Sequence, residues 1–467
     1  MMKKYLKNQY TKVIATALVI PAMLLGACKK LIEIPPSLAT QVSTARVYSD
    51  STNVISALAG VYAGFGAGSY VFNINGGLLD VYTGLSSDET VYSFPGYAPL
   101  DAISANNIQP DNAITAGFWS TGYQGIYSVN AFLEGVTGNT KISASFQNQV
   151  RGEALLTRSL YYFNLVNIFG GVPIITSTDY KINTTKARAT VDEVYSLIIS
   201  DLTTAISLMS DKYPSAGRLR PDVNAARALL ARVYLYRGRW KEASDMSSLI
   251  INSGLYDLVA PNVTFTDGSR EAIWQMLTLD PYNQTAVAQS FVPYDTTSQP
   301  TYILSDNLIN AFEAGDKRFT AWTGKNTDGI TSWIYPAKYK NHTKTDSPLE
   351  QWMIFRIGEQ YLIRAEALAN QGLLDEARAD INRIRTRAGL GNTTAVTKDE
   401  VLAVIAKERQ TELFDEWGHR WFDLKRTGKA TAVLGPLKPN WTASDELYPI
   451  PLSEIKTNPF LVQNPGY

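Results

Sequence analysis

Carboxylates that stand near arginines are the residues of this chain whose type and spacing most invite a chemical role. They recur in helix-like stretches at three places: Glu153 with Arg158; Glu366 with Arg356, Arg385 and Arg387; and Glu408 with Arg409 and Glu412. A glycoside hydrolase needs two carboxylates flanking one sugar bond, so these acids are formal candidates for that reaction. An arginine beside a carboxylate lowers its pKa, however, and so disables it as a general acid near neutral pH. We therefore interpret these residues as structural ion pairs and expect no catalytic residue.

Other reaction chemistry has few residues to work with. The chain contains one cysteine, Cys28, and two histidines, His342 and His419. Zinc and other transition metals prefer cysteine and histidine ligands, and a Cys/His nucleophile pair needs both residue types together. The sequence also lacks a Gly-rich phosphate loop and a Gly-x-Ser-x-Gly elbow. We expect no metal site and no cofactor, and we interpret His419 as a packed, hydrogen-bonded ring.

Aromatic residues in loop-like stretches point instead to ligand binding. Sugar rings pack their C–H groups on flat aromatic faces, while their hydroxyls need amide or carboxylate partners. Two stretches supply both kinds of group. The first has Tyr92, Phe94 and Tyr97 between Ser87-Asp88-Glu89 and Asn106-Asn107, and the second has Tyr282, Asn283, Gln284, Tyr294 and Asp295. These are our candidate ligand-binding residues.

The N-terminus carries the features of a lipoprotein signal. Lys3, Lys4, Lys7 and Lys12 precede an apolar run over residues 13–25, and Leu25-Gly26-Ala27-Cys28 follows. As a helix the run would reach only about 20 Å, too short for a bilayer core of about 30 Å. We predict a signal peptide over residues 1–27, lipidation at Cys28, a tether over 28–40 and one domain over 41–467. An ordinary secretory signal with an incidental cysteine is the alternative.

Charge argues against a nucleic-acid partner. Lys plus Arg and Asp plus Glu both number 43 in the full chain. Removal of the four signal lysines leaves a mature net charge of about −4. A nucleic-acid surface needs a concentrated basic patch, and none follows Lys30 apart from Arg-rich helical faces.

Helical periodicity dominates the rest of the chain. Apolar residues recur every three or four positions over residues 50–62, 117–136, 150–169 and 192–209. Residues 224–251 and 359–388 each contain two such segments joined at Gly238 and Gly372, and aligning these glycines superposes Ala231 on Ala365 and Glu242 on Glu376. This repeat resembles the tetratricopeptide hairpin. We predict a mostly α fold with about four such hairpins.

The remaining segments have less regular patterns. Residues 64–115 predict long loops around short pieces of structure, and residues 280–300 also predict a loop. Residues 272–277 and 333–335 predict strands, 398–417 predict a helix, and the chain after residue 426 predicts irregular structure. Trp274 is predicted to be buried, whereas Trp322, Trp333 and Trp352 stay open between core and ligand contact.

Motifs along nearly the whole mature chain resemble those of the SusD/RagB family, the outer-membrane lipoproteins of Bacteroidetes. Their order and spacing agree with the family throughout. The matching segments are Gly152-Glu153-Ala154 with Arg158, Tyr162 and Phe163; Phe169-Gly170-Gly171-Val172-Pro173; Arg188 through Asp201-Leu202; Asp316 and Arg318; Phe355-Arg356 through Glu366-Ala367; Ile381-Asn382-Arg383-Ile384-Arg385; Arg387-Ala388-Gly389; Glu408-Arg409 and Glu412-Leu413; Gly418-His419-Arg420-Trp421 with Asp423-Leu424; Pro449-Ile450-Pro451 with Glu454-Ile455; Asn458-Pro459; and Gln463-Asn464-Pro465.

The resemblance implies a helical scaffold that carries an irregular nutrient-binding face. A member of this family captures a nutrient, usually an oligosaccharide, and delivers it without catalysis to a SusC-like TonB-dependent transporter. The helical-repeat face would contact the transporter. Lipid anchoring at the outer membrane, with the protein facing outward, is also implied, although Lys29 and Lys30 stand where surface-exported relatives often carry acids. Binding segments vary within the family, so the resemblance assigns no individual ligand-contact residue.

Two alternatives of other classes stay open at this point. A glycoside hydrolase on a helical scaffold would release reducing ends from a polysaccharide, whereas a structural lid of the transporter would bind no soluble nutrient. The sequence also leaves the ligand open among starch, mannan, xylan, a host glycan and a peptide.

Overall fold

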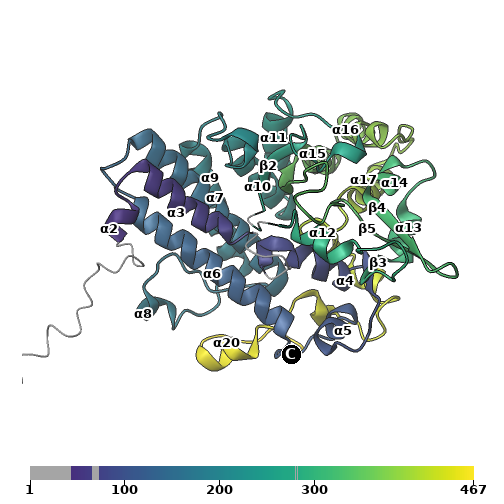
Figure 1. The fold of residues 1–467 in the computed structure, drawn as a ribbon, viewed down its shortest axis with the longest axis horizontal. Helices are drawn as coiled ribbons and strands as arrows, with labels where there is room; N and C mark the ends of the chain where they lie inside the picture. Colours follow the sequence, from purple (N-terminus) through teal and green to yellow (C-terminus); the bar gives the residue numbers. More distant parts are fainter. Residues whose placement is uncertain (1–43, 66–72, 279, 281) are drawn as a thin grey trace, which may run out of the picture.

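The computed structural model describes residues 44–65, 73–278, 280 and 282–467. The predicted signal peptide, Cys28 and the tether over 28–40 lie outside these residues. Helices dominate the described chain, and the strands are short (Figure 1). The predicted mostly α fold class is therefore confirmed. Within the described ranges, no helix combines the length and apolar character needed to cross a membrane.

Long helices packed in antiparallel pairs form the scaffold. The pairs are α3 with α6, α7 with α9, α10 with α11, and α15 with α16, and α17 packs against α15 and α16. Their bounds are α3 Ser51–Ala63, α6 Ala113–Val136, α7 Ala144–Phe169, α9 Val191–Leu208, α10 Val223–Tyr236, α11 Trp240–Ile251, α15 Ile357–Asn370, α16 Leu374–Arg387 and α17 Lys398–Glu412. Each predicted helix of the hairpins is present.

Two of these helices begin earlier than their apolar pattern indicates, because polar caps precede the pattern. The Asn112 side chain accepts hydrogen bonds from the amides of Ile114 and Thr115 at the start of α6. The Ser143 hydroxyl accepts from the Phe146 amide at the start of α7. Capping satisfies amides that have no partner inside the helix and so extends it toward its N-terminus.

The predicted repeat has a direct structural basis in its turns. Gly238 and Gly372 have φ angles of +65° and +83°, a conformation that L side chains rarely adopt. The small residues Ala231 and Ala365 are fully buried. Small buried side chains let paired helices approach closely, as the sequence pattern predicts.

Between α11 and α15, which pack directly on one another, the chain leaves the scaffold and returns. The departing strand β2 (Ala272–Met276) pairs antiparallel with the returning strand β6 (Trp352–Arg356). Two further antiparallel pairs are β4 (Thr323–Thr327) with β5 (Ser332–Pro336), and β3 (Tyr302–Leu304) with the distant β1 (Thr90–Tyr92). Other elements of this insertion are η3 Pro261–Val263, α12 Ala286–Phe291, α13 Asp306–Ala311 and α14 Lys317–Trp322.

The short pieces of structure predicted within residues 64–115 are present as η1 (Ile74–Thr83), α4 (Gly84–Ser86), β1 and α5 (Ala98–Ser104). The sequence hides η1 because Gly76 and Gly77, which are poor helix formers, depart from helical angles inside it. Two predictions of irregular structure were wrong, because residues 280–300 include α12 and the chain after residue 426 contains α19 (Ala430–Leu434), η4 (Ala443–Glu446) and α20 (Leu452–Thr457).

The helix predicted over 398–417 ends at Glu412. Asp415, Trp417 and Gly418 have φ angles of +49°, +50° and +71°. Positive φ values break the helix, and α18 (His419–Arg426) begins after them. The shorter elements that complete the described fold are α2 Thr44–Val47, α8 Tyr180–Asn183 and η2 Ala216–Arg218.

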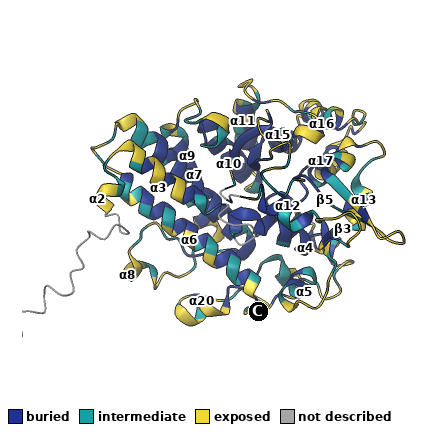
Figure 2. Ribbon diagram, viewed as in Figure 1, coloured by how far each residue is buried: buried dark blue, intermediate teal, exposed yellow. Residues whose placement is uncertain are grey.

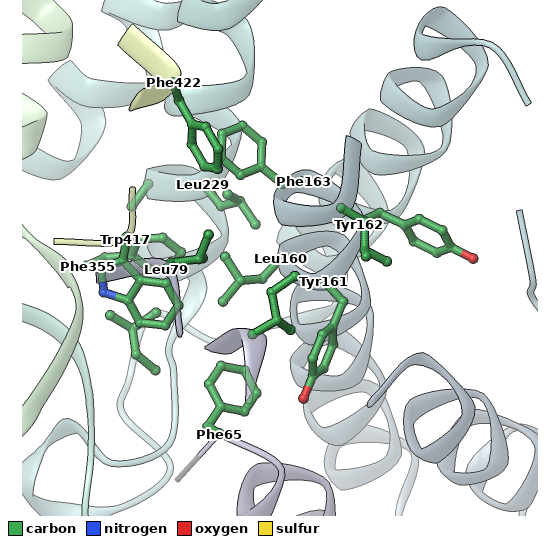
Figure 3. Close-up of a cluster of buried hydrophobic side chains, with 14 of the residues drawn as sticks. Phe65, Leu79, Leu160, Tyr161, Tyr162, Phe163, Leu229, Phe355, Trp417 and Phe422 are labelled. Carbon is green, nitrogen blue, oxygen red and sulfur yellow. The ribbon is translucent and has the colours of Figure 1, made fainter. Parts of the chain in front are cut away.

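A continuous core joins the scaffold to the insertion and to the C-terminal segment. Helix α7 is buried along most of its length (Figure 2). Figure 3 shows Phe163 of α7 facing Phe422 of α18, and their ring centroids lie 6.3 Å apart. Trp274, predicted to be core, is fully buried, and Trp322 and Trp352 are also buried, whereas Trp333 is half-buried.

Candidate functional site

The first predicted aromatic stretch lies on and after β1. Tyr92 is the last residue of β1 and is partly buried, whereas Phe94 and Tyr97 are 48% and 53% exposed. Tyr97 immediately precedes α5. We call Tyr92, Phe94, Tyr97, Tyr282 and Tyr294 the aromatic face.

A row of ring contacts leads from β1 to the second stretch. In the β1–β3 ladder Tyr92 stands opposite Tyr302, and their ring centroids are 5.9 Å apart. Tyr302 meets Phe291 of α12 edge-on at 5.7 Å. Phe291 is buried and lies three residues before Tyr294. The fold thus links two stretches that are almost 200 positions apart in the sequence, and Figure 1 places α12 beside β3.

The second stretch pairs with a later segment of the insertion. Asn283 forms an antiparallel bridge with Thr343. The Lys344 amide donates to the Tyr282 carbonyl, and the Gln284 amide donates to the His342 carbonyl. Side chains alternate between the faces of a ladder, so this register puts Tyr282 and His342 on the same face. Tyr282 is 77% exposed there.

Tyr294 lies on top of His342. The two rings are stacked with centroids 4.1 Å apart and an interplanar angle of 27°. The Tyr294 hydroxyl donates to Gln289 Oε1 at 2.7 Å. The opposite face of the ring is open, because Tyr294 is 78% exposed. Sequence reasoning missed His342 and Gln289, since nothing in their local pattern ties them to Tyr294.

The two polar candidates of this stretch are engaged in local turns. The Asp295 carboxylate accepts hydrogen bonds from Ser298 and Thr297. These bonds hold the pKa of Asp295 well below its usual value, so it is ionised at neutral pH. Asn283 Nδ2 donates to Asp280 Oδ2 at 3.2 Å. A ligand hydroxyl at either residue would share a group that already has a protein partner.

Most of the polar residues that flank the first stretch are buried, whereas Asn107 is exposed. Asp88 forms a two-bond ion pair with Arg420 at 2.6 and 2.8 Å, and the Asn106 side chain donates to the Ser86 carbonyl. Glu89 is also buried. These residues anchor β1 and are not available to a surface ligand.

A buried acidic cluster lies beneath β1 and consists of Asp80, Glu89 and Asp415. Burial raises the pKa of Asp80 to about 7, and burial with neighbouring carboxylates raises the pKa of Glu89 well above its usual value. A raised carboxyl pKa is common among catalytic acids. These side chains are each no more than 5% exposed, however, so a polymeric substrate cannot reach them.

The conspicuous charged motifs form a second cluster inside the protein. We call it the ionic core, and it consists of Glu271, Asp316, Arg318, Lys338, Arg356, Arg385, Arg387, Glu408, Glu412 and Glu416. Arg356 contacts Glu412 at 2.6 Å and Glu416 at 2.8 Å, and Arg318 contacts Glu408 at 2.8 Å. Although burial alone would raise it, Arg387, Arg356 and Arg318 hold the pKa of Glu412 well below its usual value. A carboxylate so held cannot serve as a general acid.

The other motif acids are also paired with arginines, though often with different ones from those nearest in sequence. Glu153 pairs with Arg220 at 2.6 Å, whereas Arg158 pairs with Asp201 at 2.8 Å. Glu366 pairs with Arg426 at 2.6 Å. Structural ion pairing is confirmed, and the partners come from α9, from α18 and from the segment that precedes α10.

His419 is a packed ring, as predicted, but the predicted hydrogen bonding is not complete. Its Nε2 lies 3.8 Å from Glu359 Oε1, and its buried Nδ1 has no hydrogen-bond partner among the described residues. Burial, reinforced by nearby arginines, lowers the pKa of His419 well below its usual value. Across the described ranges, no three His, Cys, Asp or Glu side chains are grouped so that they could hold a metal ion.

The scaffold carries a groove of about 830 Å³ between the α10–α11 turn, α15, α17 and the segment after α18. Its apolar lining includes Trp240, Leu402 and Val433, and its charged lining includes the paired Glu366 and Arg426. The groove is lined by none of the aromatic face, so it is a separate surface.

Comparisons with known proteins agree in one family. A family model described as starch-binding and associating with the outer membrane matches residues 80–235, and a model described as the SusD family matches residues 263–467. SusD-like protein P2 of Formosa agariphila is 27% identical over 420 residues, covering 76% of this chain and 81% of the relative.

Solved structures share the fold over most of the chain. A SusD superfamily protein from Bacteroides vulgatus superposes with a TM-score of 0.78 at 23% identity, covering 90% of this chain and 100% of that protein. A structure named as a laminarin-binding SusD-like protein gives a TM-score of 0.74 at 26% identity, with the same coverage of both chains. The family predicted from the sequence motifs is confirmed.

Proposed function

This chain belongs to the SusD family, and from that premise we propose that it binds an oligosaccharide or polysaccharide and delivers it to a SusC-like TonB-dependent transporter. The observation that carries the proposal is the aromatic face on this scaffold, where Tyr282 and Tyr294 are 77% and 78% exposed. Exposed apolar surface that is contiguous, unlike a single exposed ring, is typical of a site where a protein meets a partner.

Sugar chemistry matches these rings. The apolar face of a pyranose packs on a flat aromatic ring, and its hydroxyls bond to neighbouring polar groups. Tyr92, Phe94, Tyr97, Tyr282 and Tyr294 would supply the stacking surfaces, with Asn283 and Asp295 as polar neighbours. The name of the laminarin-binding relative and the starch-binding description of the matching family model support a glycan as the ligand class.

We propose that the protein acts by binding and not by catalysis. The motif acids that would be needed for glycoside hydrolysis are paired with arginines, and the acids with raised pKa values are buried. A hydrolase needs two accessible carboxyl groups with different protonation states at one sugar bond.

Anchoring and assembly complete the proposal. We propose that lipid at Cys28 holds one SusD-like domain, residues 41–467, at the outer membrane and facing outward, with the helical scaffold against the transporter. The outer-membrane description of the matching family model supports this location. Labelling of Cys28 with a radioactive fatty acid, together with co-purification of a barrel protein in mild detergent, tests both parts.

The central experiment measures glycan binding by the full chain. Calorimetry with laminarin, soluble starch, xylan and mannan is expected to give binding to at least one polysaccharide and no release of reducing ends. Ala substitution at Tyr92, Tyr97, Tyr282 or Tyr294 is expected to weaken that binding while the melting temperature changes little. Unchanged affinity in all four variants would rule out the site. Reducing ends would favour the hydrolase, and absence of binding would favour the structural lid.

A further inference from the structure

Tyr294, Gln289 and His342 form a closed set of contacts. The Tyr294 ring stacks on the His342 ring at 4.1 Å, and its hydroxyl donates to Gln289 Oε1 at 2.7 Å. Gln289 Nε2 in turn donates to the His342 carbonyl at 2.8 Å. Each residue of the three therefore contacts both of the others, which fixes the plane of the Tyr294 ring and its rotation within that plane.

This arrangement is unusual for a side chain that is 78% exposed. An exposed tyrosine normally samples several rotamers, and a ligand must then order it at an entropic cost. Here one face of the ring is covered by imidazole while the other remains open to solvent. The ring is thus ordered before any ligand arrives.

The imidazole of His342 lowers the stability of the fold at this position. Both of its nitrogens are buried without a hydrogen-bond partner among the described residues. Buried polar atoms without partners destabilise a fold, and an aliphatic side chain would avoid that loss. What an aliphatic residue would not supply is a flat surface for the stack. The stack with Tyr294 therefore accounts for an aromatic ring at this position.

The backbone holds His342 itself. Its carbonyl accepts from the Gln284 amide at 2.9 Å as well as from Gln289, and the neighbouring Thr343 pairs with Asn283. Gln284 is buried and its side chain bonds to the Thr343 carbonyl at 2.8 Å. The support beneath Tyr294 is therefore anchored to two segments of the insertion that are joined by a β-bridge.

We propose that His342 and Gln289 are positioning residues that hold Tyr294 as a preformed, one-sided platform for a pyranose ring. The inference rests on the proposed function. Because only the outer face of the ring is free, the platform takes a sugar from the side and does not sandwich it. It therefore suits residues within a polysaccharide chain as well as those at its end.

Three variants separate positioning from general stability. His342→Leu removes the flat ring and keeps a side chain of similar bulk, His342→Phe keeps a flat ring, and Tyr294→Ala removes the platform. With laminarin as the first probe, and soluble starch, xylan and mannan as the others, we expect Tyr294→Ala to weaken binding about tenfold. We expect His342→Leu to weaken it about three- to tenfold and His342→Phe to stay within about twofold of the parent protein.

A readout without ligand tests the stack directly. The chain has only two histidines, and the other, His419, is buried in the core, so the ring protons of His342 can be followed by NMR. The ring current of Tyr294 should displace the His342 signal upfield, and Tyr294→Ala should return it. Addition of a bound polysaccharide should move the same signal in the parent protein.

The outcomes distinguish the inference from the function it rests on. Binding by the parent protein that is unchanged in His342→Leu, or equally weak in His342→Phe and His342→Leu, would overturn the positioning role alone. A His342 signal unaffected by Tyr294→Ala would also overturn it. Absence of binding by the parent protein to all four polysaccharides would overturn the proposed function and this inference together.

Discussion

The ionic core and the aromatic face differ in how they appear in the sequence and in what surrounds them in the fold. The ionic core gathers motif residues from several helices, and Arg318, Arg356 and Glu412 are each no more than 2% exposed. The aromatic face gathers one residue from the end of β1 and four residues outside helices and strands, and these four rings are between 48% and 78% exposed. The residues with the most conspicuous chemistry thus hold the scaffold, while the inconspicuous ones are available to a ligand.

This contrast has a physical basis. A buried ion pair needs fixed geometry on both sides, and helices at constant spacing provide it. A ring that meets a sugar needs access and a suitable plane, and a short loop supported by a few contacts provides that. Different ligands can therefore be served by changing loops while the charged scaffold stays the same.

The largest effect is expected from breaking the ionic core. Arg356→Met removes from the ionic core a guanidinium that pairs with both Glu412 and Glu416. Removing one member of a buried ion pair costs about 3–5 kcal/mol, so the free energy of unfolding in urea should fall by that amount. A variant as stable as the parent protein would mean that the ionic core is not structural.

A second experiment asks whether unpaired buried acids behave differently from paired ones. Burial raises the folded-state pKa of Asp80 to about 7, above its value of about 3.8 in the unfolded chain. The folded protein therefore binds more protons between about pH 4 and pH 7, and its stability falls as the pH rises through that window.

Asp80→Asn should remove this dependence. The amide oxygen can still accept from the Trp417 amide, which bonds to Asp80 Oδ1 at 2.9 Å. We expect the variant to be more stable than the parent protein at pH 8, by on the order of 1–3 kcal/mol, and nearly equal at pH 4. Asp211→Asn, at an exposed position, is the matched control and should change neither value. An equal effect at both pH values would contradict the shift.

On the aromatic face the expected change is in affinity and not in stability. Tyr282→Ala removes an exposed ring, so we expect binding to the best polysaccharide to weaken about two- to tenfold. The melting temperature should stay within about 2 °C, because little buried area is lost. The buried Tyr302 is the contrasting position, since Tyr302→Ala should lower the melting temperature as well. A large loss of stability in Tyr282→Ala would contradict the prediction that Tyr282 acts in binding and not in folding.

The smallest effect is expected at a surface ion pair. Lys241 and Asp245 are joined at 2.7 Å, and their side chains are 75% and 50% exposed. Lys241→Ala should leave the melting temperature unchanged within about 1 °C, because solvent screens such pairs. A loss comparable to that of Arg356→Met would show that burial is not what distinguishes the ionic core.

Much of the scaffold could be predicted because its helices are encoded locally. Apolar spacing, capping residues and the glycines at 238 and 372 each act within a few positions of the chain. The partner of Glu153 could not be predicted, since Arg220 lies 67 positions away, in the segment that precedes α10. The His342 support of Tyr294 also depends on a register formed across the insertion. The sequence allowed candidate exposed rings to be named, but not the contacts that orient them.

The pairing of β2 with β6 means that the insertion starts and finishes at one place on the scaffold. Between β2 and β6, the ionic-core residues Arg318 and Lys338 join the insertion to Glu408 and Glu416. We therefore expect that each stretch between these contacts can change in length or sequence while α11 and α15 stay packed on one another. Changes in ligand preference could then arise in one stretch of the insertion at a time, without changes in the helical scaffold.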